Sequence, residues 1–104
     1  MIELQNKVAV ITGGVSGLGR ATAECFVREG ARVALFDLND DLGKQLDAEL
    51  GDNVIFVRVD VASEASVKAG FAEVRARFGA LHVCINLRGH RAGWKNIGVL
   101  FRST

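Results

Sequence analysis

A glycine-rich stretch between a β-branched run and an amphipathic pattern constrains this chain more than any other feature of its sequence. Residues Lys7–Thr12 read KVAVIT, a short apolar run typical of a strand that is buried on both faces. Gly13 follows directly, and apolar residues then recur at helical spacing over Gly17–Glu29 until Gly30, which predicts a C-cap. The chain therefore begins as a strand, a glycine turn and a helix.

The same alternation repeats along the next fifty residues. In chain order, the further expected elements are a strand at Arg32–Asp37, a helix at Asp40–Leu50, a strand at Asn53–Asp60, a helix between an N-cap at Ser63 and Gly79, and a strand at Leu81–Asn86. Short connections between continuously apolar strands favour a parallel sheet. We predict an α/β fold in the order β-α-β-α-β-α-β, with helices on both faces.

Length and composition suit one compact domain, because the 104 residues are 49% hydrophobic. No apolar run approaches the roughly 20 residues that cross a bilayer, and the first residues lack the pattern of a signal peptide. Cys25 and Cys84 are isolated, which fits a reducing compartment and no metal cluster. We expect a cytoplasmic protein, or one of the mitochondrial matrix in a eukaryote.

The charge of the chain changes sign at one point. Residues 1–86 hold nine of the thirteen Lys and Arg and all twelve Asp and Glu, a net charge of −3, whereas 87–104 carry +4. After Asn86 no helical or strand periodicity persists. We therefore predict a nucleotide-binding unit over 1–86 and an irregular basic tail over 87–104. The tail contains two aromatic residues, Trp94 and Phe101, which is weak evidence for an arm that binds nucleic acid or a membrane. We expect neither partner.

The loop TGGVSGLG, between the first strand and the first helix, predicts a phosphate site. Gly13, Gly17 and Gly19 follow the spacing G-x-x-x-G-x-G, and a backbone without Cβ atoms can approach a pyrophosphate closely. A helix that begins near Gly17 points unpaired N–H groups at the phosphates, and Ser16 can add a hydroxyl donor. The alternative is an ordinary turn, but the position between strand and helix favours binding.

Two acidic positions follow at the ends of later strands. Asp37 lies 18 residues after Gly19, where a carboxylate can accept both ribose hydroxyls of adenosine and would repel a 2′-phosphate. This favours NAD over NADP, although Asp37 could instead cap the next helix. Asp60 and Val61 end the third strand at the same edge of the sheet, where open α/β folds bind ligands. Taken alone, Asp60 could equally be a turn residue.

These motifs together resemble the short-chain dehydrogenases/reductases, and residues 7–86 are similar to the type 2 3-hydroxyacyl-CoA dehydrogenases. The resemblance implies part of a Rossmann-like fold and the NAD-dependent oxidation of a secondary alcohol such as a 3-hydroxyacyl-CoA. It also implies a cofactor site in which Gly13, Ser16, Gly17, Leu18 and Gly19 hold the pyrophosphate, Asp37 the adenine ribose, and Asp60 and Val61 the adenine.

The chain departs from the family after its fourth strand. The family continues N-N-A-G or N-C-A-G, whereas here Asn86 is followed by Leu87 and Arg88 before Gly89. The resemblance places hydride transfer on a Ser, a Tyr and a Lys further on. This chain has no Tyr, and Ser103 stands in no such context. We therefore predict no catalytic residues and an inactive chain, with a small-molecule alcohol or ketone substrate only in a full-length form.

A shift of reading frame accounts for the break. Codons that are allowed for residues 87–98 encode C-A-G-I-A-P-A-G-K-T-L-G when they are read one base further on. Together with Asn86, this sequence restores the family's N-C-A-G. A genuine alternative ending remains open. So do three functions: the cofactor-binding half of a dehydrogenase, a non-catalytic NAD-binding or partner-binding fragment, and a product without function.

Two further expectations concern the fourth strand and its neighbours. Four parallel strands would leave its apolar edge open to aggregation or pairing, and the family's surfaces for oligomer assembly would be absent. His82 and His90 lack the spacing of metal ligands, and Cys84 is expected to be a small core residue.

Overall fold

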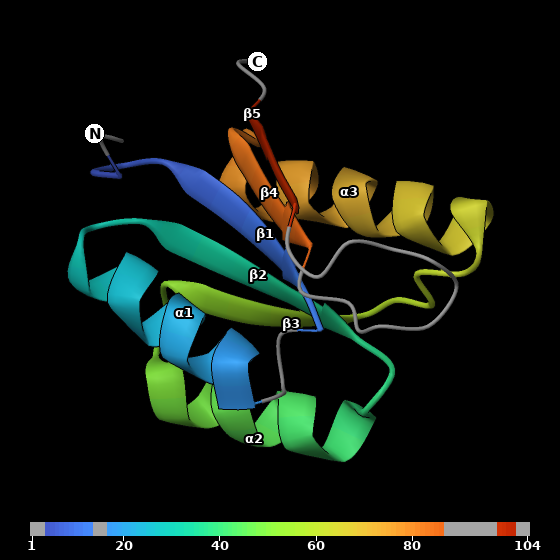
Figure 1. Ribbon diagram of the computed structural model, residues 1–104, viewed down its shortest axis with the longest axis horizontal. Coiled ribbons are helices and arrows are strands. Elements are labelled where there is room, and N and C mark those ends of the chain that lie inside the picture. Colours follow the sequence, from blue (N-terminus) through green and yellow to red (C-terminus); the bar gives the residue numbers. More distant parts are fainter. Residues whose placement is uncertain (1–3, 14–16, 87–97, 102–104) are drawn as a thin grey trace.

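The computed structural model describes residues 4–13, 17–86 and 98–101, which form one five-stranded sheet with helices on both faces (Figure 1). In chain order the elements are β1 Val8–Thr12, α1 Gly17–Arg28, β2 Arg32–Asp37, α2 Asp40–Leu50, β3 Val54–Arg58, α3 Glu64–Phe78, β4 Val83–Asn86 and β5 Gly98–Phe101. The predicted α/β fold is confirmed. The third and fourth strands are each two or three residues shorter than predicted, because β3 ends at Arg58 and β4 begins at Val83.

The strand order is β3-β2-β1-β4-β5, and the first four strands are parallel. β1 lies in the centre, where Thr12 is level with Phe36 of β2 and Asn86 of β4. Asp37 at the end of β2 is level with Arg58 at the end of β3. The carboxyl ends of four strands therefore meet along one edge of the sheet.

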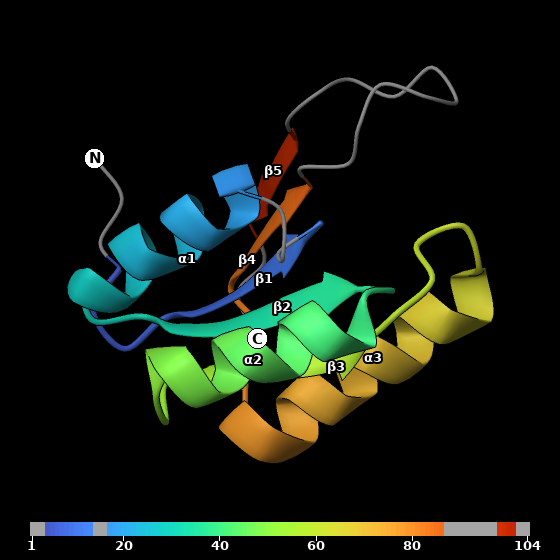
Figure 2. The same cartoon turned by 90° about the horizontal axis from the view of Figure 1, so that it is seen from below.

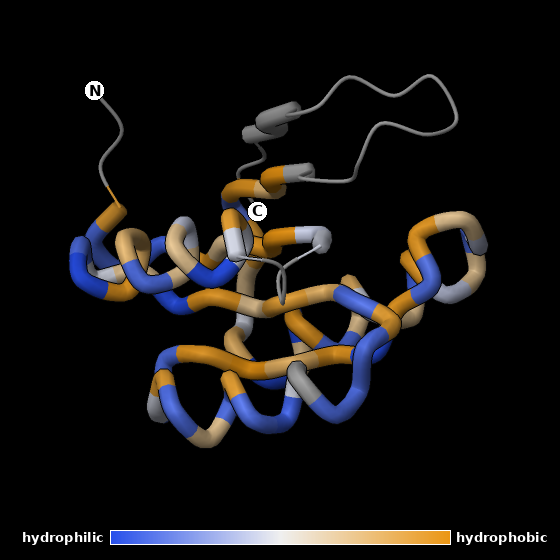
Figure 3. The backbone as a smooth tube through the Cα atoms, turned by 60° about the horizontal axis from the view of Figure 1, so that its bottom comes forward, coloured by the Kyte–Doolittle hydropathy of each residue, from blue (hydrophilic) through white to orange (hydrophobic). Residues whose placement is uncertain are grey.

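Alternate residues of the strands build two separate cores. Helices α1 and α2 cover one face and α3 covers the other (Figure 2). On the α1/α2 face the most buried side chains include Ile11, Ala23, Leu35, Leu46 and Val54. On the α3 face they include Val10, Phe36, Val57, Val59 and Val74. Figure 3 shows the result, with hydrophobic strands between helices of mixed hydropathy.

The ends of α3 follow the signals in the sequence. Ser63 is extended, with φ −109° and ψ 115°, and its hydroxyl accepts the N–H of Ser66 at 3.2 Å. Gly79 has φ 83°, and its N–H donates to the carbonyl of Arg75. An L side chain rarely adopts this left-handed conformation, so glycine ends the helix here. Both caps confirm the predicted limits of this helix.

The segment after β4 differs from its prediction. Gly98–Phe101 form β5, antiparallel to β4, with Val83 level with Phe101 and Asn86 level with Gly98. An irregular course over 87–104 is therefore wrong for these four residues, and the edge of β4 is not open. The physical reason is that the short apolar run GVLF finds backbone partners on β4, although four residues are too few to show a period. Residues 87–97 and 102–104 lie outside the described residues, and so do the departures predicted at Leu87 and Arg88.

In the part of the chain that the structure describes, no helix has both the length and the apolar character needed to span a membrane.

Candidate functional site

The glycine turn leaves the sheet immediately after β1. Gly13 has φ 70°, a left-handed conformation that favours glycine, and its N–H donates to the carbonyl of Phe36 at 2.8 Å. This bond ties the start of the turn to β2. Ser16, predicted to add a hydroxyl donor, lies outside the described residues.

Gly17 and Gly19 differ in what surrounds them. No described atom lies within 4 Å of a Cβ built on Gly17, and its φ is outside the left-handed region. Within the described residues, neither packing nor backbone conformation requires glycine there. Leu18 is 57% exposed beside it. Gly19 is buried, which lets α1 approach the sheet closely.

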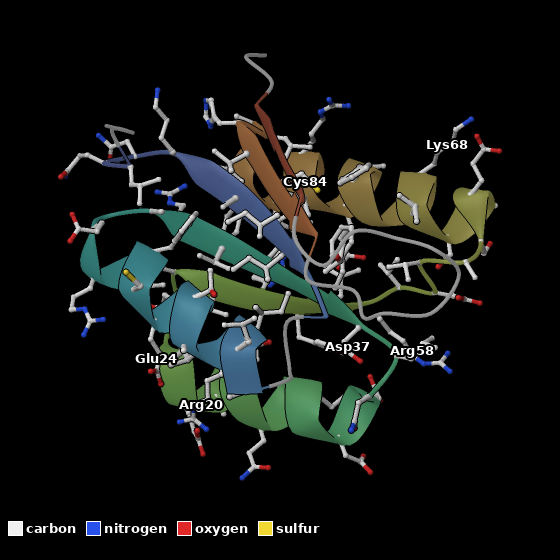
Figure 4. All side chains as sticks on the ribbon, in the orientation of Figure 1. Arg20, Glu24, Asp37, Arg58, Lys68 and Cys84 are labelled. Atoms are coloured by element: carbon white, nitrogen blue, oxygen red, sulfur yellow. The ribbon has the colours of Figure 1, made fainter. Side chains whose placement is uncertain are left out.

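Asp37 lies half-buried at the end of β2 (Figure 4). Its Oδ1 accepts the backbone N–H of Asn39 at 3.0 Å, and its carbonyl accepts the N–H of Val59 at 3.1 Å. This bond closes a turn at Asn39, one residue before α2, and does not by itself make the helix cap considered from the sequence. A carboxylate offers about four acceptor positions, and the bond to Asn39 uses one of them. Arg58 is exposed on the neighbouring strand, so a cation flanks this carboxylate.

The loop after β3 is fixed by a small hydrogen-bond network. The N–H of Asp60 donates to Ser66 Oγ at 2.9 Å, and Asp60 Oδ1 accepts the N–H of Ala62 at 3.0 Å. The carbonyl of Asp60 accepts the N–H of Ser63 at 2.9 Å. Sequence reasoning missed Ser66, although its position three residues after the N-cap Ser63 is a usable signal. The network holds Asp60 and the half-buried Val61 in one conformation at the edge of the sheet.

The strand order sets these groups side by side. The Asp60–Val61 loop follows β3, Asp37 ends β2, and the glycine turn follows β1, and these three strands are neighbours in the sheet. With strands about 4.8 Å apart, the outer two groups lie on the order of 10 Å from each other. The edge thus carries the Asp60 loop, the carboxylate of Asp37 and the N-terminus of α1 in a row, which suits an elongated ligand with a phosphate at one end.

The remaining candidate side chains have structural partners. His82 Nδ1 accepts the N–H of Val8 at 3.0 Å, while the N–H of His82 donates to the carbonyl of Val8 at 2.9 Å. Cys84 is half-buried and packs against the α3 core, and this burial raises the pKa of its thiol. Over residues 4–13, 17–86 and 98–101, no group of three His, Cys, Asp or Glu side chains could hold a metal ion. His90 lies outside the described residues.

Comparison with known proteins identifies relatives over most of the chain. Residues 7–98 match the family described as short chain dehydrogenase. The chain is 46% identical over 86 residues to 3-hydroxyacyl-CoA dehydrogenase type-2 of Drosophila melanogaster, which covers 83% of this chain and 34% of that protein. It is 48% identical over 87 residues to 3-beta-hydroxysteroid dehydrogenase of Comamonas testosteroni, covering 84% and 34%. The resemblance drawn from the sequence is confirmed.

A solved structure supports the same conclusion. The 3-ketoacyl-(acyl-carrier-protein) reductase from Brucella melitensis, complexed with NADH, superposes with a TM-score of 0.73 at 35% identity. The match covers 75% of this chain and 32% of the reductase. The chain spans about a third of the length of the relatives that it matches.

Proposed function

The chain belongs to the short-chain dehydrogenase family, and on this premise we propose that it binds NAD along the carboxyl edge of its sheet. The observation that carries the proposal is the order of groups along that edge. The Asp60–Val61 loop, Asp37 and the glycine turn follow one another in the order adenine, ribose and pyrophosphate of a dinucleotide. The related reductase is complexed with NADH, which supports a nicotinamide dinucleotide as the ligand.

Each part of the edge suits its portion of the cofactor. Phosphate oxygens at the N-terminus of α1 would meet the positive end of its dipole, and Gly17 has no side chain to obstruct them. Gly13, Ser16, Leu18 and Gly19 complete the proposed pyrophosphate side. Asp37 would accept the ribose hydroxyls and disfavour a 2′-phosphate, so NAD is preferred to NADP.

We propose no catalytic residue in these 104 residues, since they contain no Tyr to act as the family's general acid/base. A complete dehydrogenase with this cofactor half would oxidise a secondary alcohol. A 3-hydroxyacyl-CoA is the first substrate to test, because one of the relatives is named for it. With this alcohol and NAD, the purified chain is expected to form no NADH above the blank. Saturable NADH formation that scales with protein concentration would show that the chain is an enzyme by itself.

Calorimetric titration of the purified chain with NAD tests the binding proposal. The nicotinamide half of the site would have few partners, so we expect a Kd no tighter than millimolar. This corresponds to a binding free energy on the order of 4 kcal/mol. Gly17→Ala is expected to weaken binding without loss of stability, because the new Cβ meets no described atom in the fold. Micromolar affinity, or an effect of Gly17→Ala on unfolding rather than on binding, would contradict this site.

The choice of cofactor has its own matched pair of variants. Asp37→Asn is expected to reduce the preference for NAD over NADP, since it removes the charge that opposes a 2′-phosphate. Asp52→Asn, at an exposed position in the turn between α2 and β3 at the opposite edge of the sheet, removes the same charge away from the site and is expected to leave the preference unchanged. Equal effects of the two variants would mean that the preference follows net charge and not Asp37.

We further propose that the codons after Asn86 are read in a shifted frame. Support comes from the N-C-A-G motif that allowed codons of residues 87–98 recover in the next frame, and from the change in charge at this point. Sequencing the coding DNA tests this directly. The shifted frame is expected to run on into a segment with a Ser and a Tyr-x-x-x-Lys, and a stop codon before it would refute the proposal.

A further inference from the structure

Arg58 is a cation at the carboxyl edge that the proposed NAD site does not use. It is the last residue of β3 and lies level with Asp37, the last residue of β2. The residues two positions earlier, Leu35 and Phe56, both pack in the core of the α1/α2 face. Because side chains alternate between the two faces of a sheet, Asp37 and Arg58 lie on that same face. Figure 4 shows both residues at the same end of the sheet.

The charge of Arg58 is available to a ligand that binds beside Asp37. Residues that are level on adjacent strands lie about 4.8 Å apart, so the two positions are direct neighbours. The side chain of Arg58 is exposed, and within the described residues it takes part in no ion pair. By contrast, Lys44 of α2 pairs with Asp40 at 3.2 Å. A guanidinium is always charged, so Arg58 attracts anions at this edge.

The group of a dinucleotide that suits this position is a phosphate on the adenine ribose. When Asp37 accepts the ribose hydroxyls, a phosphate on one of them lies beside its carboxylate. A planar guanidinium can bind such a phosphate through two parallel hydrogen bonds. The positive end of the α2 dipole is a weaker candidate, because Asp40 and Asp41 in the first turn of that helix already oppose an anion.

We propose that Arg58 is a specificity-determining residue that binds the 2′-phosphate of NADP and thereby offsets the repulsion from Asp37. The site then accepts NADP as well as NAD, and Asp37 retains only a small preference for NAD. This inference rests on the proposed NAD site and adds to it a residue that distinguishes the two cofactors.

Two other roles of Arg58 predict different behaviour. A charge on an edge strand discourages pairing with another chain, and β3 is an end strand of the described sheet. In that role Arg58 would change self-association and not the binding of either cofactor. A guanidinium stacked on the adenine would strengthen NAD and NADP equally, because both carry the same base. The ratio of the NAD and NADP affinities therefore separates the proposed role from both others.

NMR titrations of the full 104-residue chain with NAD and with NADP test the proposal, because amide chemical shifts report dissociation constants in the millimolar range. Arg58→Gln is expected to weaken NADP binding about tenfold, equivalent to about 1.4 kcal/mol, and to leave the Kd for NAD unchanged. The unchanged Kd for NAD also shows that the variant is folded. Arg58→Lys keeps the charge without the planar fork, so its Kd for NADP is expected to lie between those of the unmodified chain and Arg58→Gln.

Arg28→Gln is the matched control. Arg28 is exposed in the last turn of α1, which ends just before the start of β2, so the variant removes the same charge away from the carboxyl edge. Its Kd values for both cofactors are expected to match those of the unmodified chain.

Three results would each overturn the role of Arg58. These are an unchanged NADP Kd in Arg58→Gln, an equal loss of NAD and NADP binding in that variant, and an equal loss of NADP binding in Arg28→Gln. In each case, binding of NAD by the unmodified chain leaves the proposed function intact. If the unmodified chain binds neither cofactor, the proposed function and the role of Arg58 both fail.

Discussion

The two faces of the sheet are built from similar strand residues and differ in how many described helices share them. On the α1/α2 face, Leu46 of α2 is 4% exposed, and Arg20 of α1 reaches Glu49 of α2 at 2.9 Å. On the α3 face, Val74 is fully buried, and Val67 and Phe71 are half-buried. Phe26, Val27 and Leu50 are half-buried on the α1/α2 face as well. The comparison teaches that pairing α1 with α2 adds an ion pair between the helices and does not bury their apolar flanks more deeply.

The helices also approach the sheet in a similar way on both faces. α2 lies over Phe56 at Gly43, where an added Cβ would clash with the ring. α3 lies over the sheet at Gly70, where an added Cβ would be 2.7 Å from Val59 Cγ2 and 2.9 Å from Phe36 Cζ. The two faces therefore resemble each other beneath their helices.

The largest expected effect separates a buried side chain from a half-buried one. Leu46→Ala, between α2 and the sheet, is expected to lower the free energy of unfolding by about 2–5 kcal/mol, because it removes buried methyl groups and leaves a cavity. Phe71→Ala removes a larger side chain but is expected to cost less, since the half-buried Phe71 is already partly exposed. Urea unfolding of both variants measures the difference, and a larger loss for Phe71→Ala would mean that Phe71 is packed as tightly as Leu46.

A smaller effect tests the contacts beneath the helices. Gly43→Ala and Gly70→Ala each overpack a helix–sheet contact, which costs about 1–3 kcal/mol, offset by about 1 kcal/mol of better helix propensity. We expect the greater loss at Gly43, because α2 is held beside α1 and the Phe56 ring lies directly over the added methyl group. At Gly70 the added Cβ would be 2.7 Å or more from its neighbours, so the overlap is smaller. Thermal unfolding of the two variants ranks them, and an equal or greater loss at Gly70 would mean that the extent of overlap does not decide the loss.

Much of this organisation could be predicted from the sequence, because the signals that carry it are local. Glycines and β-branched runs marked the strands and turns, Ser63 and Gly79 marked the ends of α3, and the parallel topology then placed Asp37 and Asp60 at one edge. The binding roles of these residues stay predictions.

Other features depend on contacts between distant segments, and these could not be predicted. β5 exists because Gly98 and three apolar residues pair with β4, and four residues are too few to show a period in the sequence. The bond from Asp60 N–H to Ser66 Oγ likewise depends on how the loop after β3 folds back on α3.

The smallest expected effect contrasts two thiols, the exposed Cys25 on α1 and the half-buried Cys84 on the α3 face. Burial raises the pKa of the Cys84 thiol in the folded chain. As pH rises, the unfolded chain therefore loses the thiol proton before the folded chain does. The associated stability is present below the ordinary thiol pKa and is lost as pH rises toward the raised value. Between about pH 7 and pH 10, Cys84→Ala should therefore show a shallower fall in unfolding free energy than Cys25→Ala, measured by urea unfolding under reducing conditions. Identical slopes for the two variants would mean that Cys84 is as solvated as Cys25.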